Sequence, residues 1–441
     1  MTRTALTALA TLFLAVPALA DDDAFPAILE GHAILPAQTL IPAPEDAPAA
    51  LQVSGKYTSL PRLTAAPTDG AELPFAGQPV QGFSGIQAIG DGSYYVLTDN
   101  GFGSKKTSPD TMLFFHVVRP DWDTGEVAVE KTTFLSDPDR VIWYPIAMEG
   151  TETRYLTGSD LDLEGFQVID GKIFIGEEFG PFVIVADAET GVVEEIFETT
   201  VNGVTIRSPD NPALVAGNPD KPDAGANLNR SKGFEGFAAA PDGSMIYGLL
   251  EGPVWDAESG SYETVDGTEA LRIVEFDVAA RGWTGRSFLY PLEADGHAIG
   301  DFNMIDETRG LVIERDNGQG DAALACAEGE SADCFEKPAL FKRVYLIDMA
   351  GIEDGQPVRK LGHIDLLDIR DPEGVARQGG KDGVYTMPFV TIENVDIVDD
   401  SHIIVGNDNN FPFSKGRDLV ARDDNELVLL DVAEFLKAGT E

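Results

Sequence analysis

The sequence contains five copies of one two-part pattern. In each copy an acidic, amide or hydroxyl residue lies near the start of an apolar run, and a second polar residue follows about 11 to 16 residues later. The five pairs are Ser84 and Asp99, Glu164 and Glu178, Glu235 and Glu251, Asn303 and Glu314, and Glu393 and Asp408. Repeats on this scale indicate a radial or stacked architecture.

A turn separates the two parts of each copy. In the first three copies it is an Asp-Gly pair, at 91–92, 170–171 and 242–243. Asp-Gly between alternating apolar runs is typical of a tight β-hairpin, because glycine accepts the positive φ that the turn requires. The fourth and fifth copies have polar turns at 308–310 and 399–401. Each copy is therefore predicted to form a hairpin.

A third apolar strand follows each hairpin, and the first four copies contain a weaker fourth one. The third strands are expected at 112–118, 182–187, 271–277, 344–348 and 427–431. Four antiparallel strands per repeat, with repeats starting about 70 to 90 residues apart, form the blade of a β-propeller. We therefore predict an all-β fold, a β-propeller with five or six four-stranded blades.

The N-terminal segment is expected to close the ring. The fifth copy ends near Asp431 without a fourth strand of its own, whereas residues 32–60 contain strand-like runs without a hairpin motif. We therefore predict that the N-terminal segment adds strands to the last blade. The expected organisation is a signal peptide at 1–20, a segment at 21–81 that supplies closing strands, and a propeller domain at 82–441.

Residues 1–20 have the features of a secretory signal peptide: Arg3, an apolar stretch at 6–16 and small residues around Ala20. Cleavage is expected near Ala20, which predicts a periplasmic or secreted protein. No other run of about 18 apolar residues occurs, so no membrane span is expected. In the oxidising compartment that export implies, Cys326 and Cys334 are expected to form a disulfide.

The chain is strongly acidic, with 31 Lys and Arg against 75 Asp and Glu and a formal net charge of −44. This charge repels nucleic-acid phosphates and excludes nucleic-acid binding. Most of the excess is expected on a solvated surface. The five histidines are scattered without a close pair, which disfavours a histidine-based zinc site and a histidine-nucleophile phosphatase.

In a propeller, matching positions of successive blades converge on the central channel, so the repeated acids are expected to lie together. Crowded carboxylates raise one another's pKa unless a cation neutralises them. Oxygen ligands without His or Cys select hard cations, and their number favours Ca²⁺ over Mg²⁺. The expected metal ligands are Asp99, Glu164, Glu235, Glu251, Asn303, Glu393 and Asp408. Alternatively, individual acids bind backbone N–H groups of the next blade and act as latches.

Five motifs in chain order resemble the family called esterase-like activity of phytase, which is built on a phytase-like domain. The motifs are 83–86 with 97–101, 163–166 with 176–181, 233–237, 312–316 and 407–411. The resemblance covers roughly residues 82–431, and five motifs in order are fairly specific. It implies an exported propeller that hydrolyses phosphate esters, with calcium as its metal.

On this basis we predict a metal-dependent hydrolase that acts on a small anionic phosphate ester and is a monomer. Glu178 or Glu314 is the expected general base, and Arg315 and Lys232 are expected to offset charge in the transition state. The sequence has no Gly-x-Ser-x-Gly motif, so a serine-esterase mechanism has no visible nucleophile. Two alternatives stay open: a non-catalytic binding or scaffold propeller with a structural calcium, and a calcium-dependent lactonase or carboxyl esterase.

Overall fold

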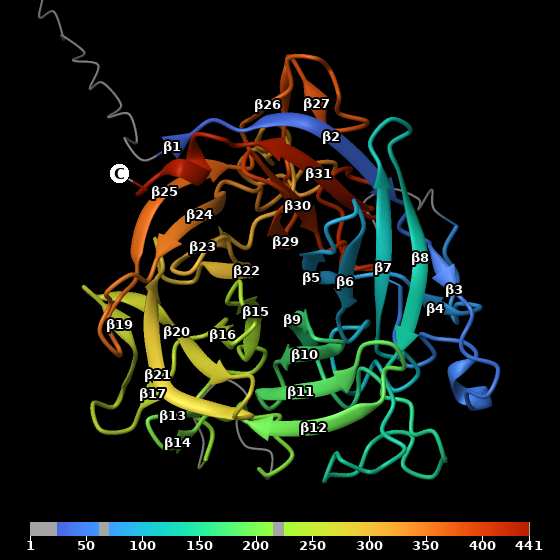
Figure 1. Cartoon of the computed structure of the whole chain (residues 1–441). Helices are drawn as coiled ribbons and strands as arrows, with labels where there is room; N and C mark the ends of the chain where they lie inside the picture. The colour runs from blue at the N-terminus through green and yellow to red at the C-terminus, as the bar shows by residue number, and fades with distance from the viewer. Residues whose placement is uncertain (1–23, 61–69, 215–224, 441) are drawn as a thin grey trace, which may run out of the picture.

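The computed structural model describes residues 24–60, 70–214 and 225–440. In this part of the chain, five four-stranded antiparallel sheets stand around a central axis, each with its first strand innermost (Figure 1). The predicted β-propeller is confirmed, and its described residues form five blades. The predicted signal peptide lies outside the described residues.

Four blades take their strands from one continuous stretch of chain. Blade one consists of β5 (Phe83–Ala88), β6 (Tyr94–Thr98), β7 (Phe114–Asp121) and β8 (Glu126–Phe134). Blade two consists of β9 (Leu163–Ile169), β10 (Lys172–Glu177), β11 (Phe182–Asp187) and β12 (Val193–Glu198). Blade three consists of β15 (Phe234–Ala239), β16 (Met245–Leu250), β20 (Thr268–Asp277) and β21 (Gly282–Pro291). Blade four consists of β22 (Ala298–Met304), β23 (Arg309–Arg315), β24 (Lys342–Asp348) and β25 (Arg359–Asp365).

Blade five is completed by the N-terminal segment, as predicted. It contains β29 (Ile392–Ile397), β30 (His402–Asn407), β31 (Asn425–Asp431) and, as its outermost strand, β2 (Ile28–Leu35). Strand β2 runs antiparallel to β31, and the buried His32 Nε2 lies 2.9 Å from Glu426 Oε2. Strand β1 (Ala24–Phe25) lies parallel to β25 of blade four (Figure 1).

The inner strands close a complete ring. Strands β5, β9, β15, β22 and β29 contact one another in this order, and β29 contacts β5. A separate buried apolar cluster fills each of the five interfaces between neighbouring blades. Leu311 of blade four and Val395 of blade five, for example, belong to one cluster. Because every blade packs on two others, the ends of the inner strands are held in a fixed arrangement around the axis.

The short hairpin turns follow the sequence prediction. Between β9 and β10, Asp170 has a φ of 49° and Gly171 a φ of 78°, the backbone that an Asp-Gly hairpin turn adopts. Shorter strands lie in the loops: β3 (Leu40–Ile41), β4 (Gln78–Pro79), β13 (Thr200–Val201), β14 (Val204–Thr205), β17 (Trp255–Asp256), β18 (Ser261–Tyr262), β19 (Thr264–Val265), β26 (Ile369–Arg370), β27 (Gly380–Lys381) and β28 (Val384–Tyr385). Three short 3₁₀ helices are η1 (Ala49–Leu51), η2 (Ala322–Leu324) and η3 (Phe435–Lys437).

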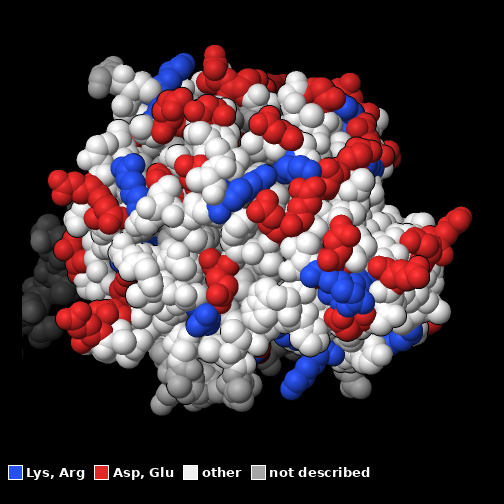
Figure 2. Space-filling view, turned by 60° about the horizontal axis from the view of Figure 1, so that its bottom comes forward, with Lys and Arg blue, Asp and Glu red and all other residues white. Residues whose placement is uncertain are grey.

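Helix content is therefore small, and none of the helices among the described residues has the length and apolar character needed to cross a membrane. The disulfide predicted between Cys326 and Cys334 is present, in the loop that joins β23 to β24. On the face shown in Figure 2, Asp and Glu side chains are widely spread, with Lys and Arg in smaller groups among them. The acidic excess is thus largely a solvated surface.

Candidate metal and anion site in the propeller channel

A β-bulge presents the first acid of three blades to the channel. In blade two, Leu163 pairs with Glu177 and Gly165 pairs with Gly176, so Glu164 between them has no partner in β10. Glu235 in β15 and Glu393 in β29 are skipped in the same way. A bulge redirects the side chain that it leaves unpaired. The same local irregularity therefore brings three carboxylates from three blades together.

A second set of acids comes from the residue that directly follows the second strand of a blade. Asp99 follows β6, Glu178 follows β10, Glu251 follows β16 and Asp408 follows β30. In three blades the residue just before the first strand holds the backbone of this acid: Glu251 N–H donates to Gly233 O at 2.8 Å, for example. The acids that these two positions provide therefore meet at one end of the channel.

The structure brings these acids into three overlapping groups, in each of which the carboxylate oxygens lie within 4.8 Å of one another. The groups are Asp162, Glu164 and Glu178; Glu164, Glu235 and Glu393; and Glu178, Glu235 and Glu251. We use "carboxylate ring" for these residues together with Asp99 and Asp408. Apart from Asp99, which is half-buried, the ring is buried; Glu235 and Glu393 are each 4% exposed.

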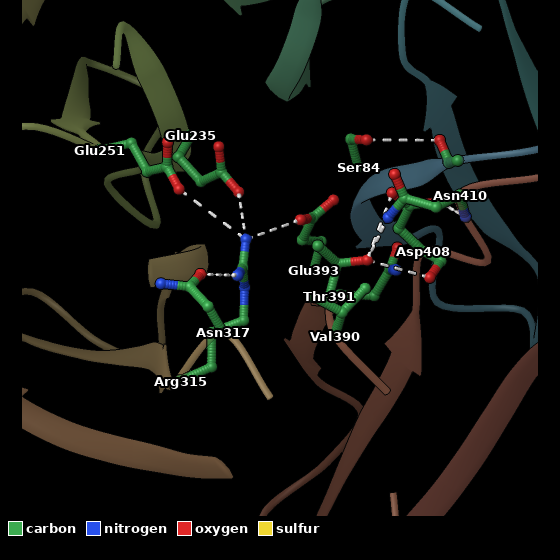
Figure 3. Close-up of polar contacts among 12 residues, drawn as sticks. Ser84, Glu235, Glu251, Arg315, Asn317, Val390, Thr391, Glu393, Asp408 and Asn410 are labelled. Atoms are coloured by element: carbon green, nitrogen blue, oxygen red, sulfur yellow. Dashed lines mark hydrogen bonds and ion pairs between the residues drawn. The ribbon is translucent and has the colours of Figure 1, made fainter. Parts of the chain in front are cut away.

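Arg315 lies within the ring. Its Nη2 atom is 3.3 Å from Glu393 Oε1, 3.8 Å from Glu251 Oε1 and 3.9 Å from Glu235 Oε1 (Figure 3). Lys232 adds a second cation, with Nζ 2.5 Å from Glu251 Oε2. These two cations compensate the side of the ring that belongs to blades three and five.

Among the described residues, no Lys or Arg forms an ion pair with Asp162, Glu164 or Glu178 on the blade-two side, although Lys232 lies near enough to Glu178 to favour its ionised form. Burial raises the pKa of Asp162 to about 8, and nearby Asp99 adds to the rise. Burial and neighbouring carboxylates also raise the pKa of Glu164 and of Glu178 well above the ordinary value. Among the described residues, the buried Asp162 Oδ1 atom has no hydrogen-bond partner. This part of the ring carries the least compensated negative charge.

Asp99 and Asp408 lie on the blade-one and blade-five side. Asp408 accepts a hydrogen bond on Oδ1 from the backbone N–H of Asn410 at 2.5 Å, and burial with nearby Glu393 raises its pKa well above the ordinary value. Asp99 is only half-buried, and burial raises its pKa to about 6. Its Oδ1 atom accepts from Gly101 N at 2.7 Å and from Gln81 Nε2 at 3.4 Å.

The prediction for Asn303 is wrong in register. In blade four the pairing of β22 with β23 passes from Ile299 directly to Phe302 and leaves out Gly300 and Asp301, and Gly300 holds the place that corresponds to Glu164. A Cβ on Gly300 would lie 1.9 Å from Ile392 O, so no side chain fits there. Asn303 lies deeper in the channel, where its Nδ2 atom donates to Val395 O at 2.8 Å and to Ile86 O at 3.2 Å. It is a latch between blades.

Glu314 is also misplaced in the prediction, by one residue. It pairs with Ile299 as Glu177 pairs with Leu163, so Arg315 holds the ring position in blade four. The carboxylate of Glu314 points away from the ring and binds Tyr290 Oη at 2.8 Å, His297 Nδ1 at 2.9 Å and Lys360 Nζ at 2.9 Å. Burial opposes its ionisation, yet the bonds to His297 and Lys360 hold its pKa below the ordinary value.

Sequence reasoning missed Asp162. It lies two residues before Glu164, and side chains two apart in an extended chain point to the same side. The alternation of Asp160, Asp162 and Glu164 was therefore an available signal. Asp160 itself is used locally, since its carboxylate accepts hydrogen bonds from Thr157 and Ala147.

Comparisons with known proteins give one family and two solved structures to which the chain is similar. A family model described as phytase-like, esterase-like activity of phytase, matches residues 78–411, a range that contains the whole carboxylate ring. Two solved structures are similar at a TM-score of 0.31: the Dos1 propeller, with 10% identity over 82% of this chain and 69% of that chain, and luciferin-regenerating enzyme, with 11% identity over 79% and 92%. No curated protein matches the chain.

Proposed function

This chain belongs to the phytase-like family, and from that premise we propose that it is an exported hydrolase of phosphate esters that works with a divalent cation, Ca²⁺, at the carboxylate ring. The observation that carries the proposal is the group of Asp162, Glu164 and Glu178, with which no Lys or Arg of the described residues forms an ion pair, beside a buried arginine. The disulfide supports export, because such bonds persist in oxidising compartments.

The donor set of the ring fits a hard cation. Asp162, Glu164 and Glu178 offer oxygen ligands only, and neither His nor Cys belongs to the three groups. The buried Asp162 Oδ1 atom without a partner needs a donor or a cation, since an unsatisfied buried polar atom is costly. These three residues would therefore hold the ion, with Glu235 at the border to the arginine side.

A divalent cation at this place would polarise a phosphoryl oxygen and lower the pKa of water. Arg315 would stabilise the charge that develops on the phosphoryl group, because its guanidinium is always protonated and is fixed by three carboxylates. Lys232, whose side chain is 36% exposed, would add positive charge near the phosphoryl group from the outer side of the ring.

Asp99 is the ring residue best suited to accept a proton from the attacking water. Its pKa of about 6 lies close to neutral pH, and a general base works best with a pKa near the working pH. Both of its hydrogen bonds end on Oδ1, so Oδ2 can face water. Glu178, the base expected from the sequence, is instead assigned to the cation group, and Glu314 lies outside the ring.

The test is a calcium titration of the metal-stripped protein, followed by thermal melting and by hydrolysis of a phosphomonoester and a phosphodiester. We expect calcium to raise the melting temperature and to switch on hydrolysis of one ester. Asp162→Asn should weaken calcium binding about tenfold or more, whereas Asp170→Asn, in an exposed turn with a φ that Asn tolerates, should not.

The opposite result has a clear meaning as well. Calcium that stabilises the protein without any turnover would favour a binding propeller with a structural ion. The deep burial of Glu235 and Glu393 gives that alternative its own support, because a buried ion is harder for a substrate to reach.

A further inference from the structure

A cavity of about 860 Å³ lies between two short hairpins that belong to blades two and three. One hairpin, β13–β14, follows the last strand of blade two, and the other, β17–β18, lies in the connection from β16 to β20 of blade three (Figure 1). Among the described residues that line this cavity, none belongs to the carboxylate ring. Its volume is within the range of small-molecule sites.

Two aromatic side chains of the β17–β18 hairpin line the cavity. Trp255 and Tyr262 are cross-strand partners, and their ring centroids lie 5.0 Å apart with the ring planes at 77°. Tyr262 Oη donates to Asn229 Oδ1 at 2.7 Å, which fixes the tyrosine ring. Trp255 is half-buried, and its indole Nε1 forms no hydrogen bond with any residue in the described ranges. The hairpin therefore offers aromatic surface and one unused N–H donor.

The β13–β14 hairpin lines the cavity with an amide and an exposed valine. Its turn is Asn202-Gly203, with φ values of 50° and 79°, the backbone that an Asn-Gly hairpin turn adopts. The Asn202 side chain is exposed in this turn, and Val204 next to it is 58% exposed. This hairpin therefore also combines apolar surface with a group that both donates and accepts hydrogen bonds.

The charged residues of the cavity are largely satisfied by one another or by their own turn. Arg272 Nε donates to Glu263 Oε1 and Oε2 at 2.9 Å each, and Arg272 Nη1 donates to Ser287 Oγ at 2.8 Å. Arg272 is the only Lys or Arg among the described lining residues. The carboxylate of Asp256 accepts two backbone N–H groups of its own turn at 2.9 and 3.0 Å. A guanidinium has five N–H donors and a carboxylate about four acceptor sites, so the Arg272–Glu263 pair keeps hydrogen-bonding capacity for a ligand.

This lining disfavours ligands that carry a charge. An anion would meet two carboxylates and a guanidinium that is already paired, and a cation would have to compete with Arg272 for Glu263. A wholly apolar molecule would bury the polar groups of Arg272, Glu263 and Asn202 without hydrogen bonds, which is costly. A neutral molecule with apolar C–H faces and hydroxyl edges fits both parts of the lining. Its C–H groups pack on the electron-rich faces of aromatic rings, and each hydroxyl both donates and accepts. A sugar ring has both features.

We propose that this cavity binds a neutral sugar, either free or as one residue of a longer glycan. Trp255 and Tyr262 supply the packing surface, and Asn202, Glu263 and Arg272 supply hydrogen bonds to hydroxyl groups. The site does not depend on the proposed hydrolase function, because no described residue of the carboxylate ring lines it. Sugar binding is therefore expected to be the same in chelator and in calcium.

Calorimetry and tryptophan fluorescence test the proposal. The probes are the methyl glycosides of glucose, galactose, mannose and N-acetylglucosamine, measured in chelator and in calcium. At least one should bind the wild type and change its tryptophan emission in a saturable way. Trp255→Ala should weaken that binding by about three- to tenfold, the range of an aromatic contact. Trp143→Ala is the matched control and should leave it unchanged, because Trp143 is 54% exposed and lies 5.2 Å from the ring of Tyr144 but does not line the cavity.

Trp255→Phe locates the site even if Trp255→Ala disturbs the fold. This variant keeps an aromatic ring, so calorimetric binding should persist while the sugar-induced change in tryptophan emission disappears. Melting curves of all three variants show whether each is folded. An emission change that persists in Trp255→Phe would place the sugar elsewhere and overturn the proposal.

Other outcomes also decide the matter. The proposal is wrong if none of the four glycosides binds, if Trp255→Ala and Trp143→Ala weaken binding alike, or if binding requires calcium. The assignment of a neutral ligand is wrong if anionic methyl glucuronide or cationic methyl glucosaminide binds more tightly than methyl glucoside. A disaccharide that binds more tightly than its monosaccharide indicates a glycan, and equal affinity indicates a free sugar. Sugar binding without ester hydrolysis would support this site and refute the hydrolase proposal alone.

Discussion

Arg315 stands in blade four where the other four blades have a carboxylate. It is held by Glu235, Glu251 and Glu393, so the ring contains its own counter-ion on one side, and in the proposed function a metal ion would bind on the other. This asymmetry gives the site a direction: an anionic substrate can bridge a metal ion and a guanidinium. Variants of Arg315 can distinguish a role in catalysis from a role in holding the ring together.

Arg315→Met should lower kcat by about 100- to 1,000-fold, the usual cost of removing one donor that stabilises transition-state charge. Calcium should bind more tightly, because the variant removes a positive charge next to the ring. Arg315→Lys, which keeps the charge, should recover part of the turnover. Parallel steady-state kinetics and calcium titration check this, and a loss of both turnover and calcium binding would show that Arg315 only holds the ring together.

Variants at Glu314 and Glu178 test which of these two residues belongs to the carboxylate ring. Glu314→Gln should leave calcium affinity unchanged but lower the free energy of unfolding by about 3 kcal/mol, because Lys360 loses the buried one of its two carboxylate partners and keeps only the more exposed Glu293. Glu178→Gln should weaken calcium binding and keep the stability of the metal-free protein, because burial and neighbouring carboxylates disfavour the ionised form of this carboxyl. Chemical denaturation and calcium titration of both variants distinguish the two positions, and interchanged results would contradict the assignment.

At this scale the sequence was informative only where the repeat is regular. Glu164, Glu235 and Glu393 share an apolar neighbour and a spacing, so their convergence could be predicted. In blade four Gly300 stands where the other copies have the acid, and the sequence pattern predicts the nearby polar residues Asn303 and Glu314 instead. Which residue is skipped by a bulge depends on strand pairing, and no local sequence signal separated Glu314 from Arg315.

At the scale of elements, the hairpins could be predicted from the sequence. That the N-terminal segment helps to close the ring could also be predicted, but not which strand it pairs with. Asp-Gly turns fix the register of a hairpin by their backbone conformation alone. Whether the N-terminal segment completes a blade or forms a further one depends on long-range pairing, here of β2 with β31. Spacing in the sequence does not contain that information.

The closing strand is expected to be essential. A chain that begins at Ala37 lacks β1 and β2, exposes the edge of β31 and leaves Glu426 without His32. We expect it to aggregate or to lose its cooperative thermal transition, since an open apolar edge strand pairs with other chains. A chain that begins at Asp21 is the control and should melt like the full-length protein. Addition of a peptide covering residues 24–38 should restore the transition, and a stable truncated protein would contradict the prediction.

At the scale of the whole molecule, the ring predicts how stability depends on pH. Burial raises the pKa of Asp162 to about 8, of Glu393 to about 7 and of Asp99 to about 6. For such groups the folded state holds its protons more tightly than the unfolded state, so stability is fully present below about pH 4 and is lost as pH rises through the folded pKa.

The metal-free protein should therefore melt at a lower temperature at pH 8 than at pH 5.5. Calcium should remove most of this difference, because it binds the ionised carboxylates, and its stabilising effect should be larger at pH 8. Calcium binding should also release protons, in numbers that fall as the pH rises. Melting curves in chelator and in calcium, with calorimetry in buffers of different ionisation enthalpy, measure both effects. A metal-free protein that gains stability between pH 5.5 and 8 would contradict the assignment.

Blade five is made from the two ends of the described chain, with β2 near its start and β31 near its end. During synthesis, β2 emerges first and has no partner until residues 425–431 have been added. A chain interrupted anywhere before Asn425 thus retains an unsatisfied strand edge, which exposes it to aggregation and to proteases. The ring can therefore close only after β31 has been synthesised, and a shorter chain is distinguished from the folded protein by its exposed strand edge.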